Sequence, residues 1–106
     1  GKSIDACNQY GETLLHVACR TGADASFRYL LDRGASVQCC DDNGRVPLHE
    51  ICRSEQPNLE MALAVLRLDT KQVHALDARN RAPLAYAPRA SWEGWYHFLH
   101  EHKSLL

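Results

Sequence analysis

Short apolar segments alternate with polar, turn-rich segments along the whole chain. The first apolar segment carries small residues and the second carries larger ones: Leu15, Val17, Ala18 and Cys19, then Phe27, Leu30 and Leu31. The same order returns at residues 48–52 and 62–66, and the larger set appears again at residues 95–99. Apolar positions three and four residues apart are typical of amphipathic helices. The pattern therefore predicts paired helices, in which small-faced helices stack against large-faced ones.

The helix pairs belong to an internal repeat. Residues 11–16 (GETLLH) realign with residues 44–49 (GRVPLH) at a shift of 33, which also places Cys19 on Cys52 and Arg20 on Arg53. The head of the pattern returns at residues 77–84 (DARNRAPL), and the extra residues before it lie around residues 55–58. Residues 1–7 match residues 34–40, so we expect them to be the end of an earlier repeat.

Turn residues recur with the same period. Gly11 and Gly44 stand where a turn requires a positive φ, and Asn80 is the best non-glycine residue for that conformation. Gly34 follows the second helix where a C-terminal cap needs a left-handed residue. We therefore expect three equivalent turns, one at the head of each unit.

Helix ends can also be assigned from single residues. Thr13 is expected to cap the first helix, and Pro47 and Pro83 suit a first helical turn, where the missing N–H costs nothing. Pro88 should cut the first helix of the last unit short. Ser91 is expected to cap the final helix.

Residues 11–19 (GETLLHVAC) and 30–37 (LLDRGASV) together resemble an ankyrin repeat, which has a 33-residue period and the motif T-P-L-H-x-A. The resemblance covers residues 1–99 and implies an all-α ankyrin-repeat solenoid of stacked helix-turn-helix units joined by β-hairpin-like turns. It divides a single domain, residues 1–106, into a repeat tail (1–7), two repeats (8–40 and 41–76) and a third repeat or C-terminal cap (77–106). The second repeat departs from the motif at Val46 and Glu50, and the third departs at Ala85.

Composition and charge narrow the class of function. With 106 residues, 45% hydrophobic and 24% charged, the chain fits one globular domain. A net charge of −1 gives no overall attraction to nucleic acid or anionic membranes. Five cysteines, an odd number, fit reduced thiols better than a disulfide framework. We therefore expect an intracellular location, cytoplasmic or nuclear.

The groups that could carry chemistry have structural explanations. Cys19 and Cys52 occupy equivalent positions that require a small buried residue, and the chain has no C-x₂-C pair for zinc. The resemblance implies that His16 and His49 hydrogen-bond the turns of neighbouring repeats. No phosphate-binding loop, nucleophile elbow or metalloprotease motif is present. We expect no enzyme activity, catalytic residue, metal, cofactor or small-molecule substrate.

Aromatic residues crowd the last helix of the chain. Half of them should pack on the preceding repeat, and the rest form either a cap or a docking patch: Trp92, Trp95, Tyr96 and Phe98. His97 and His100 share a face of this helix, but a helix C-terminus favours histidine without any metal.

The placement of arginine gives the candidate binding surface. The resemblance implies that turn tips and the exposed ends of first helices form a concave recognition face. The residues that it assigns to partner binding are Gln9, Tyr10, Glu12, Arg20, Thr21, Asp42, Asn43, Arg45, Arg53, Ser54, Arg79, Arg81 and Arg89. Arg20, Arg53 and Arg89 occupy one repeat position and form an arginine ladder, although basic residues are also common at helix C-termini.

These observations predict a non-catalytic protein-protein interaction module. Its arginines would bind an acidic or phosphorylated segment of another protein, because guanidinium groups grip carboxylate and phosphate oxygens bidentately. We expect no nucleic acid and no membrane as partner, since the chain is net acidic and the face lacks exposed aromatic residues apart from Tyr10. The alternative is a structural spacer or regulatory segment of a larger multidomain protein.

Overall fold

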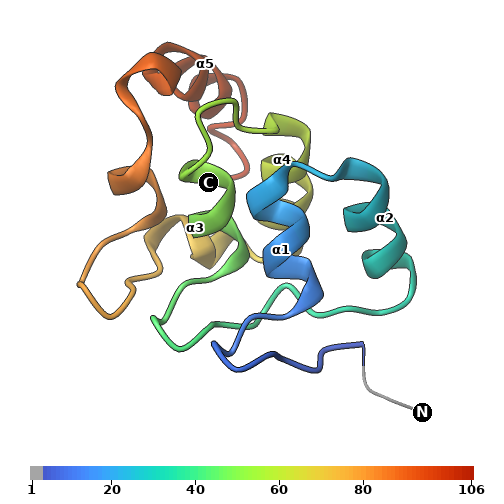
Figure 1. The fold of residues 1–106 in the computed structure, drawn as a ribbon. Helices are drawn as coiled ribbons and strands as arrows, with labels where there is room; N and C mark the ends of the chain where they lie inside the picture. Colours follow the sequence, from blue (N-terminus) through green and yellow to red (C-terminus); the bar gives the residue numbers. More distant parts are fainter. Residues whose placement is uncertain (1–3) are drawn as a thin grey trace.

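The computed structural model describes residues 4–106, which form five α-helices and three short 3₁₀ segments (Figure 1). In chain order these are α1 (Leu14–Thr21), α2 (Asp24–Asp32), α3 (Pro47–Cys52), α4 (Leu59–Leu68), η1 (Thr70–His74), η2 (Pro83–Tyr86), η3 (Arg89–Ser91) and α5 (Trp92–Glu101). Between residues 4 and 106 no strand forms, and an isolated antiparallel bridge joins Cys7 to Thr13. The predicted all-α solenoid is confirmed. Of the predicted repeat tail at residues 1–7, residues 1–3 lie outside the described part.

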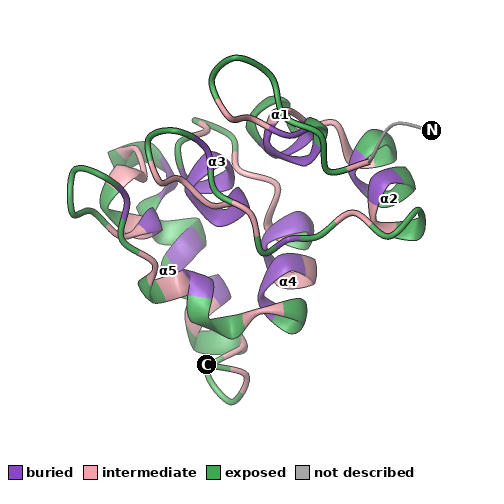
Figure 2. Cartoon of the chain, turned by 90° about the horizontal axis from the view of Figure 1, so that it is seen from below, coloured by how far each residue is buried: buried purple, intermediate pink, exposed green. Residues whose placement is uncertain are grey.

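The helices stack in layers along the chain. α1 packs against α2 and α3, and α3 packs against α4 and η2. Figure 2 shows the buried faces turned inward between these layers. The core consists mainly of the predicted apolar positions: Leu15, Ala18, Cys19, Phe27, Leu30, Leu48, Ile51, Cys52, Ala62, Val65, Leu66, Trp95 and Phe98. Leu31 and Leu99 are only half-buried and pack at its edge.

Two predicted helix ends form as expected. Thr13 Oγ1 accepts the backbone N–H of His16, whose ring nitrogen Nδ1 accepts the N–H of Thr13, so that α1 begins with a reciprocal cap. At the end of α2, Gly34 adopts a φ of 88°. Its N–H donates to the carbonyl of Leu31 and the next N–H, of Ala35, donates to Leu30, which completes a Schellman motif.

The start of α3 is satisfied by a residue that the repeat pattern did not indicate. Val46 stands where Thr13 stands in the first repeat and has no side-chain acceptor. Gln72 supplies one from η1, because its Oε1 accepts the N–H of Leu48 at 3.2 Å. Its Nε2 donates to the carbonyl of Val37 at 2.7 Å. Gln72 is buried and thus joins α3, η1 and the segment after α2.

The last unit is shortened, as Pro88 predicted. Its first helix is reduced to η2, which ends at Tyr86. Ser91 is the N-cap residue of α5, as predicted, but its side chain accepts no helix N–H, because Ser91 has φ −97° and ψ −3° instead of an extended conformation. Its hydroxyl donates to the carbonyl of Pro88 at 2.8 Å. On α5, Trp95 and Phe98 are buried while Trp92 and Tyr96 are exposed. None of the helices within residues 4–106 has the length and apolar character that crossing a membrane requires.

Candidate protein-binding site

Three turns of the same construction precede α1, α3 and η2. In each turn one side-chain oxygen accepts two backbone N–H groups at 2.9 or 3.0 Å. The accepting oxygen is Oδ1 of Asn8 in the first turn, of Asp41 in the second and of Asp77 in the third. The left-handed position of each turn falls on Gly11 (φ 76°), Gly44 (φ 73°) and Asn80 (φ 62°). The predicted equivalence of these three residues is confirmed.

The turns also bond directly to one another. The N–H of Asp42 donates to the carbonyl of Tyr10 at 3.0 Å, and the N–H of Ala78 donates to the carbonyl of Asn43 at 2.8 Å. The three tips therefore lie side by side and project from one edge of the helical layers (Figure 1). Exposed side chains project from this row of tips: Gln9, Tyr10, Asp42, Asn43 and Arg79.

Two buried histidines fix the turns to the helices. Nε2 of His16 bonds the carbonyl of Arg45 at 2.8 Å, and Nε2 of His49 bonds the carbonyl of Arg81 at 2.9 Å. Each Nδ1 accepts the backbone N–H three residues earlier, so Nε2 carries the proton and donates. The predicted role of both histidines in joining neighbouring repeats is confirmed.

The first two members of the arginine ladder form ion pairs within the chain. Arg20 pairs closely with Glu12 and lies 4.0 Å from Glu50, while Nη1 of Arg53 lies 3.3 Å from both carboxylate oxygens of Glu50. The side chain of Glu50 is 0% exposed. Sequence reasoning missed this acid, although its position in the small-residue pair of the repeat motif marked it as unusual.

Glu50 belongs to a group of three carboxylates. Oxygens of Glu12, Asp41 and Glu50 lie within 4.8 Å of one another, a spacing that could hold a metal ion. Arg20 and Arg53 already balance two of these charges. The hydrogen bond from Arg20 accordingly lowers the pKa of Glu12, with help from Asn8. We therefore interpret Glu12, Arg20, Glu50 and Arg53 as an ion-pair network. Asp41 lies beside it and accepts the N–H groups of Asn43 and Arg45.

Tyr86 organises the arginines of the second and third turns. The guanidinium carbons of Arg45 and Arg81 lie 5.5 and 5.8 Å from the centre of its ring. Its hydroxyl donates to Asp77. Burial raises the pKa of Asp77, but the bonds from Tyr86 and from two backbone N–H groups outweigh burial and hold that pKa at about 2. The cation–π contacts fix both guanidinium groups beside the third turn.

The remaining predicted site residues lie less centrally. Arg89, the third member of the ladder, stacks on Trp92 at 5.3 Å instead of joining the ion-pair network. The Thr21 hydroxyl donates to the carbonyl of Val17 within α1. Ser54 is half-buried in the loop after α3, where its oxygen accepts the N–H of Gln56.

The family follows from a comparison with known protein families. Residues 1–74 match the family model described as ankyrin repeats (3 copies). The chain belongs to the ankyrin-repeat family. Ankyrin repeats are generally protein–protein interaction modules and are generally non-catalytic.

Two curated relatives contain a similar ankyrin-repeat stretch. The Neurogenic locus Notch protein of Drosophila melanogaster is 34% identical over 84 residues, which are 79% of this chain and 3% of that protein. The Calmodulin-binding transcription activator homolog 1 of Caenorhabditis elegans is 27% identical over 88 residues, which are 76% of this chain and 7% of that protein. The chain therefore spans less than a tenth of the length of either relative.

Proposed function

We propose that this ankyrin-repeat chain is a non-catalytic binding module whose arginine-rich concave face takes an acidic or phosphorylated segment of a partner protein. The observation that carries the proposal is the fixed position of Arg45 and Arg81 on the ring of Tyr86. Rigid presentation lowers the entropy that binding costs. A guanidinium that is already oriented can bind a carboxylate or phosphate without reorganisation of the turns.

Because of the ion-pair network, we expect the arginines at the third turn to contribute most to partner binding. Arg20 and Arg53 face carboxylates of their own chain, so a partner must compete with Glu12 and Glu50 for them. Arg79 is exposed at a turn tip, and Arg81 is exposed beside it. We infer that Arg79, Arg81 and Arg45 contact the acidic groups of the partner, while Arg20 and Arg53 mainly shape the face.

Charge reversal of Arg79 and Arg81 tests the proposal. The probes are fluorescent peptides that carry aspartate, glutamate or phosphoserine, with a neutral peptide of the same length for comparison. Each lost charge-assisted hydrogen bond is worth about 1.5–3 kcal/mol, so R79E/R81E should weaken binding by roughly tenfold or more. The salt dependence of binding should also become shallower, because fewer charges are paired.

The matched control is R28E/R67E, which changes the net charge equally on the exposed faces of α2 and α4. It should leave binding nearly unchanged, and the circular dichroism of both double variants should match the parent chain. R28E faces Asp24 and Glu60, so the control should melt at a slightly lower temperature. If the control pair alone weakens binding, the recognition face is on the outer helices. If the neutral peptide binds as well as the acidic ones, acidic recognition is refuted. Arg53 is unsuitable for reversal because a glutamate there would face Glu50.

A second candidate function is a structural spacer or regulatory segment of a larger polypeptide. It is supported by the small share of each relative that the chain covers. The two functions differ in whether the third turn contacts another molecule. A spacer predicts that R79E/R81E leaves every intermolecular contact of the longer polypeptide intact, whereas a binding module predicts the loss of one.

We propose a reducing compartment, the cytoplasm or the nucleus, as the place of action. All five cysteines are unpaired, and Cys19 and Cys52 are each buried among apolar residues of the core. Unpaired thiols are typical of compartments in which disulfides do not persist. Fluorescence microscopy of a tagged natural protein would test this location.

A further inference from the structure

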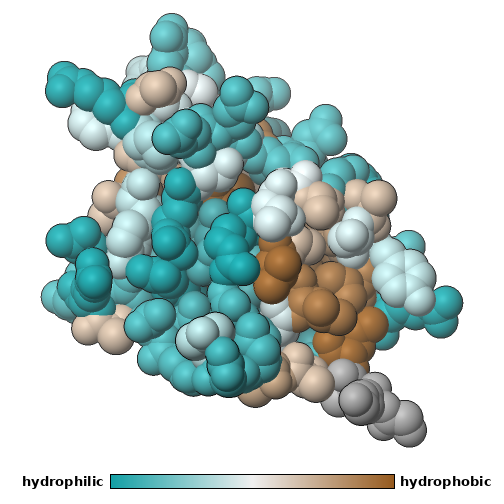
Figure 3. Space-filling model, in the orientation of Figure 1, coloured by the Kyte–Doolittle hydropathy of each residue, from teal (hydrophilic) through white to brown (hydrophobic). Residues whose placement is uncertain are grey.

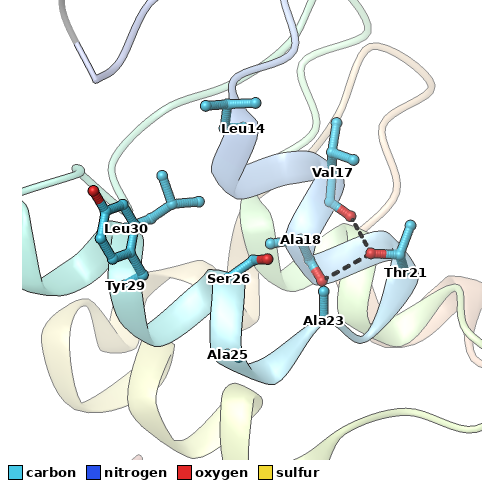
Figure 4. Close-up of a pocket in the computed structure, with 9 residues that line it drawn as sticks. All are labelled: Leu14, Val17, Ala18, Thr21, Ala23, Ala25, Ser26, Tyr29 and Leu30. Carbon is cyan, nitrogen blue, oxygen red and sulfur yellow. Dashed lines mark hydrogen bonds between the residues drawn. The ribbon is translucent and has the colours of Figure 1, made fainter.

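An apolar groove lies at the open end of the stack, between α1 and α2. It has a volume of about 490 Å³, and its lining includes Leu14, Val17, Ala18, Ser26, Tyr29 and Leu30. Figure 3 shows the hydrophobic patch over these helices, and Figure 4 shows the lining side chains that both helices contribute. Leu14 and Tyr29 are 62% and 57% exposed. Among the described residues, no charged side chain lines the groove.

The internal repeat indicates what fits this groove. The shift of 33 places Leu14 on Pro47 and Val17 on Glu50, and both of these α3 residues are buried. The second helices align at a shift of 35, which matches their buried faces and places Ser26 on Met61. Met61 is buried where α4 meets α2. The groove residues therefore occupy positions that, one repeat later, are covered by a helix pair.

The two ends of the stack differ in character. Terminal units of a solenoid need a polar outer face to stay soluble. α5, at the opposite end from α1 and α2, exposes Glu93, His97 and Glu101 among its aromatic residues. The outer face of α1 and α2 is an apolar groove instead, and exposed apolar patches of this kind mark interaction surfaces. α1 and α2 thus have the surface of an interior unit.

We propose that the groove is the seat of one further ankyrin-repeat helix pair of the same polypeptide, stacked on α1 and α2 as these stack on α3 and α4. The segment before the first turn fits this connection. Residues 4–7 are equivalent to residues 37–40, which lead from α2 into the second turn. Ile4 packs against the core, and Cys7 is bridged to Thr13. This interface is separate from the concave face and does not depend on the proposed partner.

Cysteine labelling tests the proposal at two positions of α2, one inside the groove and one outside it. Ser26→Cys places a thiol where the equivalent residue, Met61, is buried. Asp32→Cys places one at an exposed position outside the groove, where the equivalent residue, Arg67, is also exposed. Both variants are made in a background in which the exposed Cys7 and Cys40 are serine. The labelling rate is compared between the 106-residue chain and the longest natural polypeptide that contains it.

In the 106-residue chain both thiols should react fast. In the longer polypeptide the S26C thiol should react roughly tenfold or more slowly, because the covering helix pair must first open, while the D32C thiol should still react fast. Fast reaction of both thiols there, or protection of both, overturns the proposal. Protection of S26C in the isolated chain at high concentration, with dimers in sedimentation, assigns the groove to a second copy. A natural polypeptide without a helix pair ahead of Ile4 also overturns it.

Discussion

Because the carboxylate of Glu50 is buried, we expect removal of its partner Arg53 to cost more stability than removal of Glu50 itself. Its side chain is 0% exposed and depends on Arg53, at 3.3 Å, and on Arg20, at 4.0 Å. Both arginines are partly in water, with 41% of the Arg20 side chain and 35% of the Arg53 side chain exposed. Removal of Arg53 leaves a buried charge poorly compensated, whereas removal of Glu50 leaves arginines that water can hydrate. R53A should therefore destabilise the chain more than E50A.

The expected magnitudes follow from this geometry. Breaking a fully buried ion pair costs about 3–5 kcal/mol, and the exposure of Arg53 and the remaining Arg20 reduce this to about 1–3 kcal/mol for R53A. E50A loses packing of one methylene group, worth about 0.8 kcal/mol. The double variant E50A/R53A should cost about as much as E50A alone. The coupling between the two positions then equals the cost of R53A, about 1–3 kcal/mol.

Urea unfolding followed by circular dichroism measures all four free energies, with the slope of each transition confirming that the folded states are comparably compact. R67A, an exposed arginine of α4, serves as the control and should change stability by less than about 0.5 kcal/mol. Equal costs for E50A and R53A, or strictly additive costs in the double variant, would show that Glu50 does not depend on Arg53.

Two other predictions concern titratable groups. Asp77 has a folded pKa of about 2 against its ordinary value of 3.8, so the stability it contributes is present above pH 4 and is lost as the pH falls toward 2. Tyr86→Phe removes a hydrogen bond that lowers this pKa, so the variant should be less stable at neutral pH and should lose less stability between pH 4 and 2. If both chains lose the same amount of stability over this pH range, the prediction is wrong. Burial raises the pKa of Cys19 and Cys52 to about 12, so at pH 8 an alkylating reagent should modify the exposed Cys7 and Cys40 first and reach the two buried thiols only on unfolding, as mass spectrometry can count. Equal labelling rates at all four thiols would contradict the burial of Cys19 and Cys52 in the core.

The features that the sequence predicted well are local and periodic. A positive φ at Gly11, Gly44 and Asn80 depends on each residue's own steric freedom, and recurrence at the repeat period identified the three turns together. The reciprocal cap of α1 likewise depends on residues only three positions apart, Thr13 and His16. The histidine bonds between repeats came from the resemblance, because the spacing alone does not show which carbonyl lies opposite.

The features that the sequence did not predict depend on contacts between distant positions. Gln72 bonds residues 24 and 35 positions away, and no local pattern distinguishes it from an exposed glutamine. The burial of Glu50 depends on Arg20 of α1 and Arg53 after α3, so the sequence analysis assigned both arginines to a partner without the acid that pairs with them inside the chain. Ser91 stands at the start of α5 but does not cap it, because the preceding 3₁₀ turn holds it at φ −97° and ψ −3° instead of the extended conformation of a capping residue. Which of the assigned residues contact a partner stays a prediction.

Nuclear magnetic resonance titration of the labelled chain with a phosphoserine peptide tests the concave recognition face most directly. The account predicts that the largest backbone amide shifts occur in the second and third turns, around Asn43, Arg45, Arg79 and Arg81, with changes in the guanidinium signals of Arg45 and Arg81. The amides on the exposed sides of α2 and α4 should move little. Shifts concentrated on those two helices, or no saturable shifts with any acidic or phosphorylated peptide, would contradict the account.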